Sequence, residues 1–205
     1  NGPYKVASWN EKPDPKFYGG YEYGVYIPMS KLDDLETKAK AGGFYIDKEL
    51  WVTLNNNKIS FRTSESGKDS TVEISSIAPN GIFYSNKPVH IKGKISGKYT
   101  IGSSDNIWID DDIGVTDDPR KNPDSNDLLG ICSNKKIMIR DNIPNSNDVN
   151  ITAAVYAYES LYAENYSKKP YSGYINIYGS LSQGEAGFTG SGEASGGAQK
   201  MNGFN

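Results

Sequence analysis

The sequence predicts an all-β protein, a right-handed parallel β-helix with one short capping α-helix near its N-terminus. The first observation behind this prediction is a strand–corner–strand unit that recurs with its apolar residues in the same places. Its four copies occupy residues 51–61, 82–91, 99–109 and 129–139. A repeat of this kind indicates stacked coils, in which each unit buries its apolar face against its neighbours.

The second observation is the spacing of the strands that close these units. These four strands and a similar fifth strand begin at Ile59, Val89, Ile107, Ile137 and Ile175. Their starting positions are 30, 18, 30 and 38 residues apart. A fixed inner register with unequal returns is typical of a parallel β-helix, because the strands must stack while any corner can carry an inserted loop. The 18-residue interval fits three faces of about six residues each.

Two other β architectures were weighed against this one. A left-handed β-helix also uses six-residue faces, but it favours regular coils, and the returns here vary by twenty residues. A β-sandwich stays open as the alternative, since apolar residues at alternate positions are common in any β protein.

Residues 1–44 are predicted to form an N-terminal arm and the capping helix. Residues 1–28 are rich in proline, glycine and aromatic residues, which indicates an extended arm pinned by its rings. Ser30 is a suitable N-cap, Asp33 falls in the first turn, and a Gly pair at 42–43 ends the helix. We expect this helix to cover the open end of the stack, which would otherwise expose apolar side chains and unpaired strand edges.

Residues 45–183 are predicted to be the coil, and residues 184–205 a Gly/Ser-rich flexible tail or a truncated continuation. Within the coil, apolar residues alternate with polar ones, so one face of each strand is buried. The longer returns are expected to carry surface loops at residues 64–79, 110–127, 140–150 and 159–173. The first of these loops contains a strand of its own at residues 71–74.

The composition excludes some classes of partner. The chain has 205 residues and a net charge of −3 with both signs mixed, so it has no basic face for nucleic acid or anionic lipid. Its longest apolar runs are strand-sized, and we therefore expect no membrane-spanning segment. The chain begins Asn1-Gly2-Pro3-Tyr4, without a starting Met or a basic n-region, as expected of a processed or trimmed chain.

Few residues suit nucleophilic or acid–base catalysis. Cys132 is the only cysteine, which excludes an internal disulfide, and its apolar strand indicates a small buried hydrophobe. His90 is the only histidine; it alternates with Val89 and Ile91 and is predicted to point outward as an exposed polar residue of the ladder. No Gly-x-Ser-x-Gly or His-Gly motif is present, and Arg140 lacks the Lys that follows it in β-helical pectin hydrolases. An enzyme is therefore the less favoured class.

The densest charge feature is the acidic stretch at residues 110–118. Clustered carboxylates on a loop can hold Ca²⁺, and Asp110 and Asp112 are the candidate ligands. The same residues could supply the acid and base of a sugar hydrolase, or the calcium end of a polysaccharide lyase. A solvated surface loop is the simpler interpretation, because the spacing matches no EF-hand or nonapeptide calcium repeat.

A run of tyrosines follows the last predicted repeat. Flat rings that carry a hydroxyl suit sugar stacking or protein contacts. The candidate ligand surface consists of Tyr156, Tyr158, Tyr162 and Tyr166. Packing of the long return over the coil is the alternative interpretation of the same rings.

Four segments resemble a family of bacterial envelope proteins, a domain of unknown function whose members often follow a type IV pilin-like N-terminal helix. They are residues 88–101 (PVHIKGKISGKYTI), 106–113 (NIWIDDDI), 127–133 (DLLGICS) and 175–183 (INIYGSLSQ). The resemblance covers roughly residues 80–185 and its motifs are structural glycines and ladder residues. It implies a β-helix exposed at or beyond the bacterial cell surface, as part of a pilus-like assembly. No catalytic residues are implied by it, and the pilin helix is missing from this sequence.

These observations favour a non-enzymatic structural or adhesive β-helix protein at the bacterial cell surface or outside the cell. Protein partners or self-association are expected, because the ends of a coil stack must be covered or paired. A glycan ligand stays open. The alternative is a calcium-dependent module that binds or cleaves polysaccharide, in which Ca²⁺ would be the cofactor.

Overall fold

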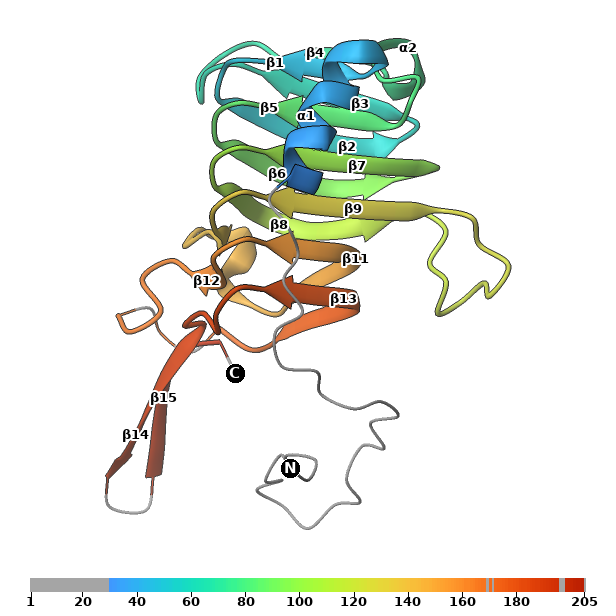
Figure 1. Cartoon of the computed structure of the whole chain (residues 1–205). Helices are drawn as coiled ribbons and strands as arrows, with labels where there is room; N and C mark the ends of the chain where they lie inside the picture. Colours follow the sequence, from blue (N-terminus) through green and yellow to red (C-terminus); the bar gives the residue numbers. More distant parts are fainter. Residues whose placement is uncertain (1–29, 169, 171, 196–197, 205) are drawn as a thin grey trace, which may run out of the picture.

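The computed structural model describes residues 30–168, 170, 172–195 and 198–204. Half of the chain is strand and a tenth is helix, which confirms the all-β class. Thirteen strands form one curled sheet, and two more form a separate hairpin (Figure 1). The arm predicted at residues 1–28 lies outside the described residues.

One ladder of the sheet consists of parallel strands that stack with their apolar residues in register. Phe83 lies beside Ile101, Ile101 beside Ile131, and Ile131 beside Val155. Each of these side chains is at most 2% exposed, so the ladder forms one wall of the core. Its strands are β1 (Phe44–Ile46), β5 (Ile82–Ser85), β7 (Lys98–Ser103), β9 (Leu128–Ser133) and the second half of β11 (Val149–Ala157).

A second ladder stacks the apolar residues Val89, Ile107, Ile137 and Leu161 in register. Its strands are β2 (Leu50–Asn56), β6 (Val89–Ile95), β8 (Ile107–Val115), β10 (Ile137–Ile139) and β12 (Leu161–Ala163). β6 and β8 pair a second time after an irregularity, from Gly93 opposite Ile113 onward. Ile113 also pairs with Ile151 of β11, so these residues form a third ladder. β13 (Ile175–Gln183) pairs with β11 over its whole length.

The corners after three strands of the first ladder are built around a buried serine. Ser85, Ser103 and Ser133 are fully buried, and each hydroxyl donates to a backbone carbonyl at 2.6 to 2.8 Å. Each oxygen also accepts the backbone N–H two residues later. These contacts satisfy the polar groups of the bend, so the chain turns without leaving unpaired groups in the core.

The first predicted repeat is not a coil. β2 and β3 (Lys58–Arg62) pair antiparallel as a hairpin, and β3 pairs antiparallel with β4 (Ser70–Glu73), so the sheet is mixed. Asn56 takes a positive φ of 56° in the turn, a conformation that asparagine tolerates better than most residues. The strand predicted at 71–74 is confirmed as β4, except that Ile74 begins α2 (Ile74–Ile77).

The fifth aligned strand is also placed differently from the prediction. Ile175 pairs with Val149 of β11, not with the ladder of Ile137. Leu161 of β12 takes that place, within the segment 159–173 that was expected to be a surface loop. Alternation is the same on every ladder, so the pattern alone did not say to which ladder a strand belongs.

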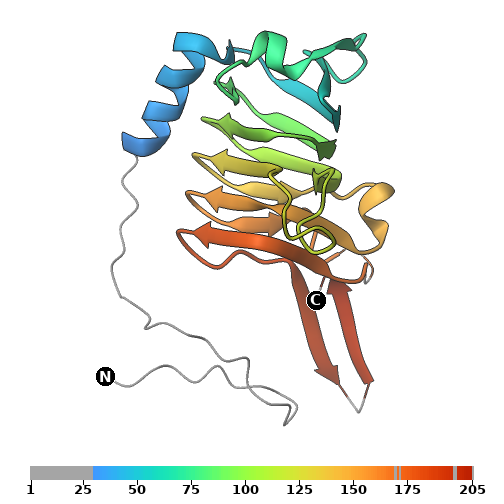
Figure 2. The same cartoon turned by 90° about the vertical axis from the view of Figure 1, so that its right-hand side faces the viewer.

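The predicted helix is confirmed as α1 (Ser30–Gly42), but its position differs from the prediction. It lies along the outside of the first ladder (Figure 2). Its Leu35 side chain approaches Gly102 of β7. The N-terminal end of the stack is covered instead by β3, β4 and α2, whose Ile59 and Ile74 are fully buried in the core. Neither of these two helices has the length and apolar character needed to cross a lipid bilayer.

The predicted tail at residues 184–205 contains regular structure. β14 (Gly190–Ser195) and β15 (Ala198–Gly203) form an antiparallel hairpin that leaves the end of the stack (Figure 1). Phe204 follows it and is only 2% exposed, as a member of the core cluster. A short 3-10 turn, η1 (Pro144–Ser146), lies in the return after β10.

Candidate functional site

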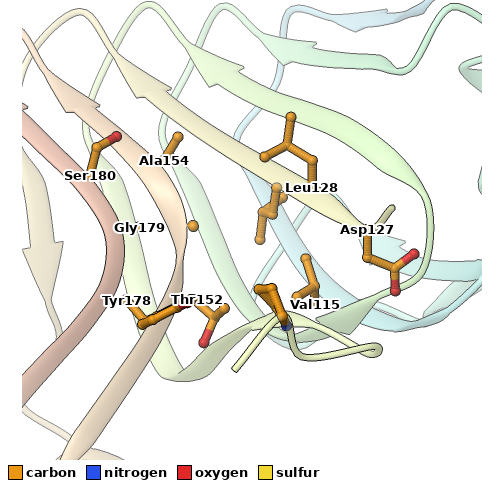
Figure 3. A pocket seen from close by; sticks show the side chains of 11 residues that line it. Val115, Asp127, Leu128, Thr152, Ala154, Tyr178, Gly179 and Ser180 are labelled. Atoms are coloured by element: carbon orange, nitrogen blue, oxygen red, sulfur yellow. The ribbon is translucent and has the colours of Figure 1, made fainter. Parts of the chain in front are cut away.

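The candidate site is a groove of about 160 Å³ beneath the return that joins β8 to β9. Most of its wall is apolar, and two large side chains at its rim face solvent: Leu128 is 57% exposed and Tyr178 is 44% exposed. We call it the Tyr178 groove; its lining comes from β8, β9, β11, β13 and the return (Figure 3). The lining residues are Val115, Pro119, Asp127, Leu128, Leu129, Thr152, Ala153, Ala154, Tyr178, Gly179 and Ser180.

Asp127 fixes the return over the groove. One carboxylate oxygen accepts the Gly97 N–H at 2.6 Å and the Ser96 hydroxyl at 3.3 Å. The other accepts the Asp117 N–H at 2.9 Å. With these three donors the Asp127 carboxylate ties the two ends of the return to Gly97 and Ser96, and so closes its base.

A charged pair lies beside the aromatic rim. The Arg120 guanidinium is 5.1 Å from the centre of the Tyr178 ring and donates to Asp118 at 2.6 Å. These hydrogen bonds from Arg120 lower the pKa of Asp118 to about 2. Next to the groove is a second hollow of about 320 Å³, which adds Lys94 and Asn150 to the polar groups within reach.

The groove combines an exposed ring, an apolar floor and hydroxyls, and the Arg120 guanidinium lies beside it. Rings and apolar floors suit the C–H faces of a sugar, while Thr152, Ser180 and Arg120 can hydrogen-bond to its hydroxyl or carboxyl groups. Tyr178 is not among the four tyrosines that the sequence indicated as the candidate ligand surface. Tyr178 stands between Ile177 and Gly179 on an alternating strand, which was the available signal of an outward ring.

The sequence suggested that Asp110 and Asp112 lie on a loop, but the structure does not place them on one. Both are in β8, at an irregularity where three residues, 110–112, stand opposite the single Lys92 of β6. Asp110 contacts the His90 ring at 3.3 Å and Arg140 at 3.5 Å. Asp112 accepts the backbone N–H of Asn150 at 2.7 Å. The two carboxylates therefore have separate protein partners.

The described residues contain no group of three or more His, Cys, Asp or Glu side chains arranged to hold a metal ion. Ca²⁺ prefers six to eight oxygens around one point. The calcium site at Asp110 and Asp112 stays a prediction.

His90 is directed away from the core, as predicted. The prediction that it is exposed is wrong, because only 8% of the residue is accessible to solvent. Its ring lies between Trp51 and Trp108, at 4.9 and 5.8 Å between ring centres and almost parallel to both. Its second ring nitrogen contacts Glu49 at 3.3 Å. The three rings stack because their residues are in register on β2, β6 and β8, and each covers the faces of its neighbours.

The four candidate tyrosines are divided between two places. Tyr162 and Tyr166 meet edge to face at 5.4 Å, and Tyr166 stacks on Phe188 at the same distance. Burial is the main cause that raises the pKa of Tyr162. Tyr156 lies in register with Cys132 on the first ladder, and Tyr158 is 40% exposed just after it. A shared ligand surface of these four tyrosines stays a prediction.

Cys132 was predicted to be a small buried hydrophobe. It lies instead on the outward side of β9, between the inward-facing Ile131 and Ser133, and is half-buried. Burial nevertheless raises the pKa of its thiol to about 11.

We expect alkylation of Cys132 by iodoacetamide at pH 8 to be about a hundredfold slower in the folded protein than in urea, because the thiolate is the reactive form. Mass spectrometry of quenched samples measures both rates, and equal rates would contradict the prediction.

Comparison of the chain with protein-family models, with curated proteins and with solved structures gives no match.

Proposed function

We propose that this chain is a non-enzymatic structural or adhesive protein of the bacterial cell surface or extracellular space, built as a right-handed parallel β-helix. The β-helix interpretation is supported by the in-register stacking of parallel strands from β5 to β13. β-Strand crossovers between parallel neighbours are right-handed in almost all proteins, which supports the handedness. A pilus-like or filamentous assembly, as the sequence resemblance implies, stays a prediction.

The adhesive contact in this proposal is the Tyr178 groove, and its ligand is a polysaccharide. The observation that carries it is the exposure of Leu128 and Tyr178 at the rim of a hollow on a stacked sheet. Large apolar side chains left in solvent beside a concave surface are typical of binding sites. Binding without cleavage is favoured because the hydrogen bonds from Arg120 lower the pKa of Asp118 to about 2, which leaves this carboxylate unsuited as a proton donor.

Replacing Tyr178 by alanine should weaken polysaccharide binding by about 5- to 150-fold, since loss of one aromatic stacking contact costs roughly 1–3 kcal/mol. Immobilised bacterial polysaccharides, including polyuronates, provide the panel for biolayer interferometry. Tyr174→Ala is the matched control, because Tyr174 is 50% exposed one strand position before β13 and does not line the groove.

Four outcomes would count against the proposal. Absence of binding to the whole panel, or equal losses in the two tyrosine variants, would refute the groove as a glycan site. New reducing ends or unsaturated products would show an enzyme instead. Loss of binding in EDTA, with recovery in Ca²⁺, would favour the calcium-dependent alternative.

A further inference from the structure

The C-terminal end of the stack has a free strand edge. Among the described residues, β13 pairs only with β11, so one side of its nine residues has no neighbouring strand. Its inward-facing apolar side chains are also incompletely covered: Ile175 and Ile177 are half-buried, and Leu181 is 38% exposed. The equivalent residues on β11, Val149, Ile151 and Val155, are at most 2% exposed.

β13 also lacks the features that protect edge strands from pairing. Its sequence, INIYGSLSQ, contains neither a charged residue nor a proline. Natural sheets discourage edge pairing with lysines, prolines, bulges or a covering segment. The opposite end of this stack has such a cover in β3, β4 and α2, with Ile59 and Ile74 fully buried beneath it.

The backbone of β13 presents hydrogen-bonding groups along its free edge. The Tyr174 carbonyl accepts the N–H of Val149 at 2.9 Å. In a parallel ladder, alternate residues turn both their N–H and their C=O to the same neighbour. Even-numbered residues of β13 therefore face β11, and odd-numbered residues, including Ile177 and Leu181, turn theirs to the free edge.

We propose that β13 pairs antiparallel with β13 of a second copy of this chain, across a two-fold axis at Gly179. This register places Ile177 opposite Leu181 of the second copy, and does so twice. It brings odd-numbered residues opposite odd-numbered residues, so the free N–H and C=O groups of both edges meet. The two apolar interiors then continue into each other end to end.

A second copy is the occupant that these features fit best. Head-to-tail stacking is blocked, because the other end of the coil is already covered by β3, β4 and α2. An uncharged strand can pair with itself without placing like charges opposite each other. A symmetric pair also closes, as most soluble assemblies do, and leaves neither β13 edge unpaired.

The dimer has a consequence for the Tyr178 groove. Tyr178 lies one residue from the axis and stands opposite Ser180 of the second copy, and both residues line the groove. The two grooves therefore meet at the interface. This consequence rests on the proposed function, whereas the dimer itself does not.

A pair of double variants tests both the dimer and its register. Asn176 and Ser182 point outward on β13 and stand opposite each other only across the proposed axis. Asn176→Lys with Ser182→Lys brings two lysine pairs together, whereas Asn176→Lys with Ser182→Glu brings two opposite-charge pairs together. Sedimentation velocity over the micromolar range should show a dimer for the parent chain. The Lys/Lys variant should dimerise about tenfold more weakly than the Lys/Glu variant, with a larger difference at low salt.

Both variants change outward-pointing residues, of which Asn176 is exposed and Ser182 is half-buried. Equal melting curves would confirm that each one folds. A parent chain that stays monomeric throughout would refute the dimer and would indicate that another segment or partner covers β13. Equal dimerisation of the two variants would refute the register. Loss of glycan binding by Tyr178→Ala with unchanged dimerisation would separate the groove from the interface.

Discussion

Replacing Ile109 or Ile139 by aspartate is expected to destabilise the protein severely. The two side chains are fully buried and lie beside each other in the second ladder, on β8 and β10. A carboxylate there has no partner among the surrounding apolar residues, and an uncompensated buried charge costs about 3–5 kcal/mol. That is a large part of the roughly 5–15 kcal/mol by which a domain is stable. Urea denaturation followed by circular dichroism measures the loss.

Met138→Asp is the control for this prediction. Met138 lies between Ile137 and Ile139 on β10 but is directed outward and is half-buried. A carboxylate at this position keeps contact with water, so we expect a smaller loss of stability. If Ile139→Asp is no more destabilising than Met138→Asp, the inward register of β10 is wrong.

Replacing Gly93 by alanine is expected to destabilise the protein by about 2–4 kcal/mol. Gly93 turns the chain within β6 with a φ of +94°, which alanine rarely adopts. A Cβ atom there would also lie 2.3 Å from the backbone carbonyl oxygen of Leu54 on β2. Neither strand can move away without breaking the pairing between β2 and β6, so the strain stays in the folded state. Thermal and urea unfolding curves measure the effect.

Gly130→Ala provides the comparison. Gly130 lies on β9 without a positive φ, and its nearest neighbours would be atoms of the Thr100 side chain, at 3.1 Å or more. That side chain can shift by a few tenths of an ångström, so we expect a loss below about 1 kcal/mol. Equal losses at Gly93 and Gly130 would contradict the importance of the backbone conformation at Gly93.

Local pattern was enough to predict the helix and most stacked strands. The Asn-rich turn at residues 55–58 was also a local signal, since such turns favour hairpins, and the first unit lacks the corner serine of the others. These two differences indicate that β2 and β3 form a hairpin and not a coil. The prediction of a coil assumed that the first unit folds like the other three.

The candidate site was predicted less well than the fold. The acidic stretch drew attention because charge density is visible in a sequence, yet Asp110 and Asp112 form hydrogen bonds or ion pairs with His90, Arg140 and Asn150. The Tyr178 groove depends on residues from β8, β9, β11 and β13, whose contact follows from stacking between distant segments. No single stretch of the sequence contains it.

The sequence by itself determined that this protein is all-β, that α1 spans Ser30–Gly42, and which residues of the repeated strands face inward. These features depend on alternation, caps and turn residues, which act over a few neighbours along the chain. Only the tertiary structure decided which ladder each strand joins, that β3, β4 and α2 cover one end, and that β13 has no second neighbour among the described strands. Those outcomes depend on contacts between segments separated by loops of unequal length, and the pattern within a strand is the same whichever neighbour it meets.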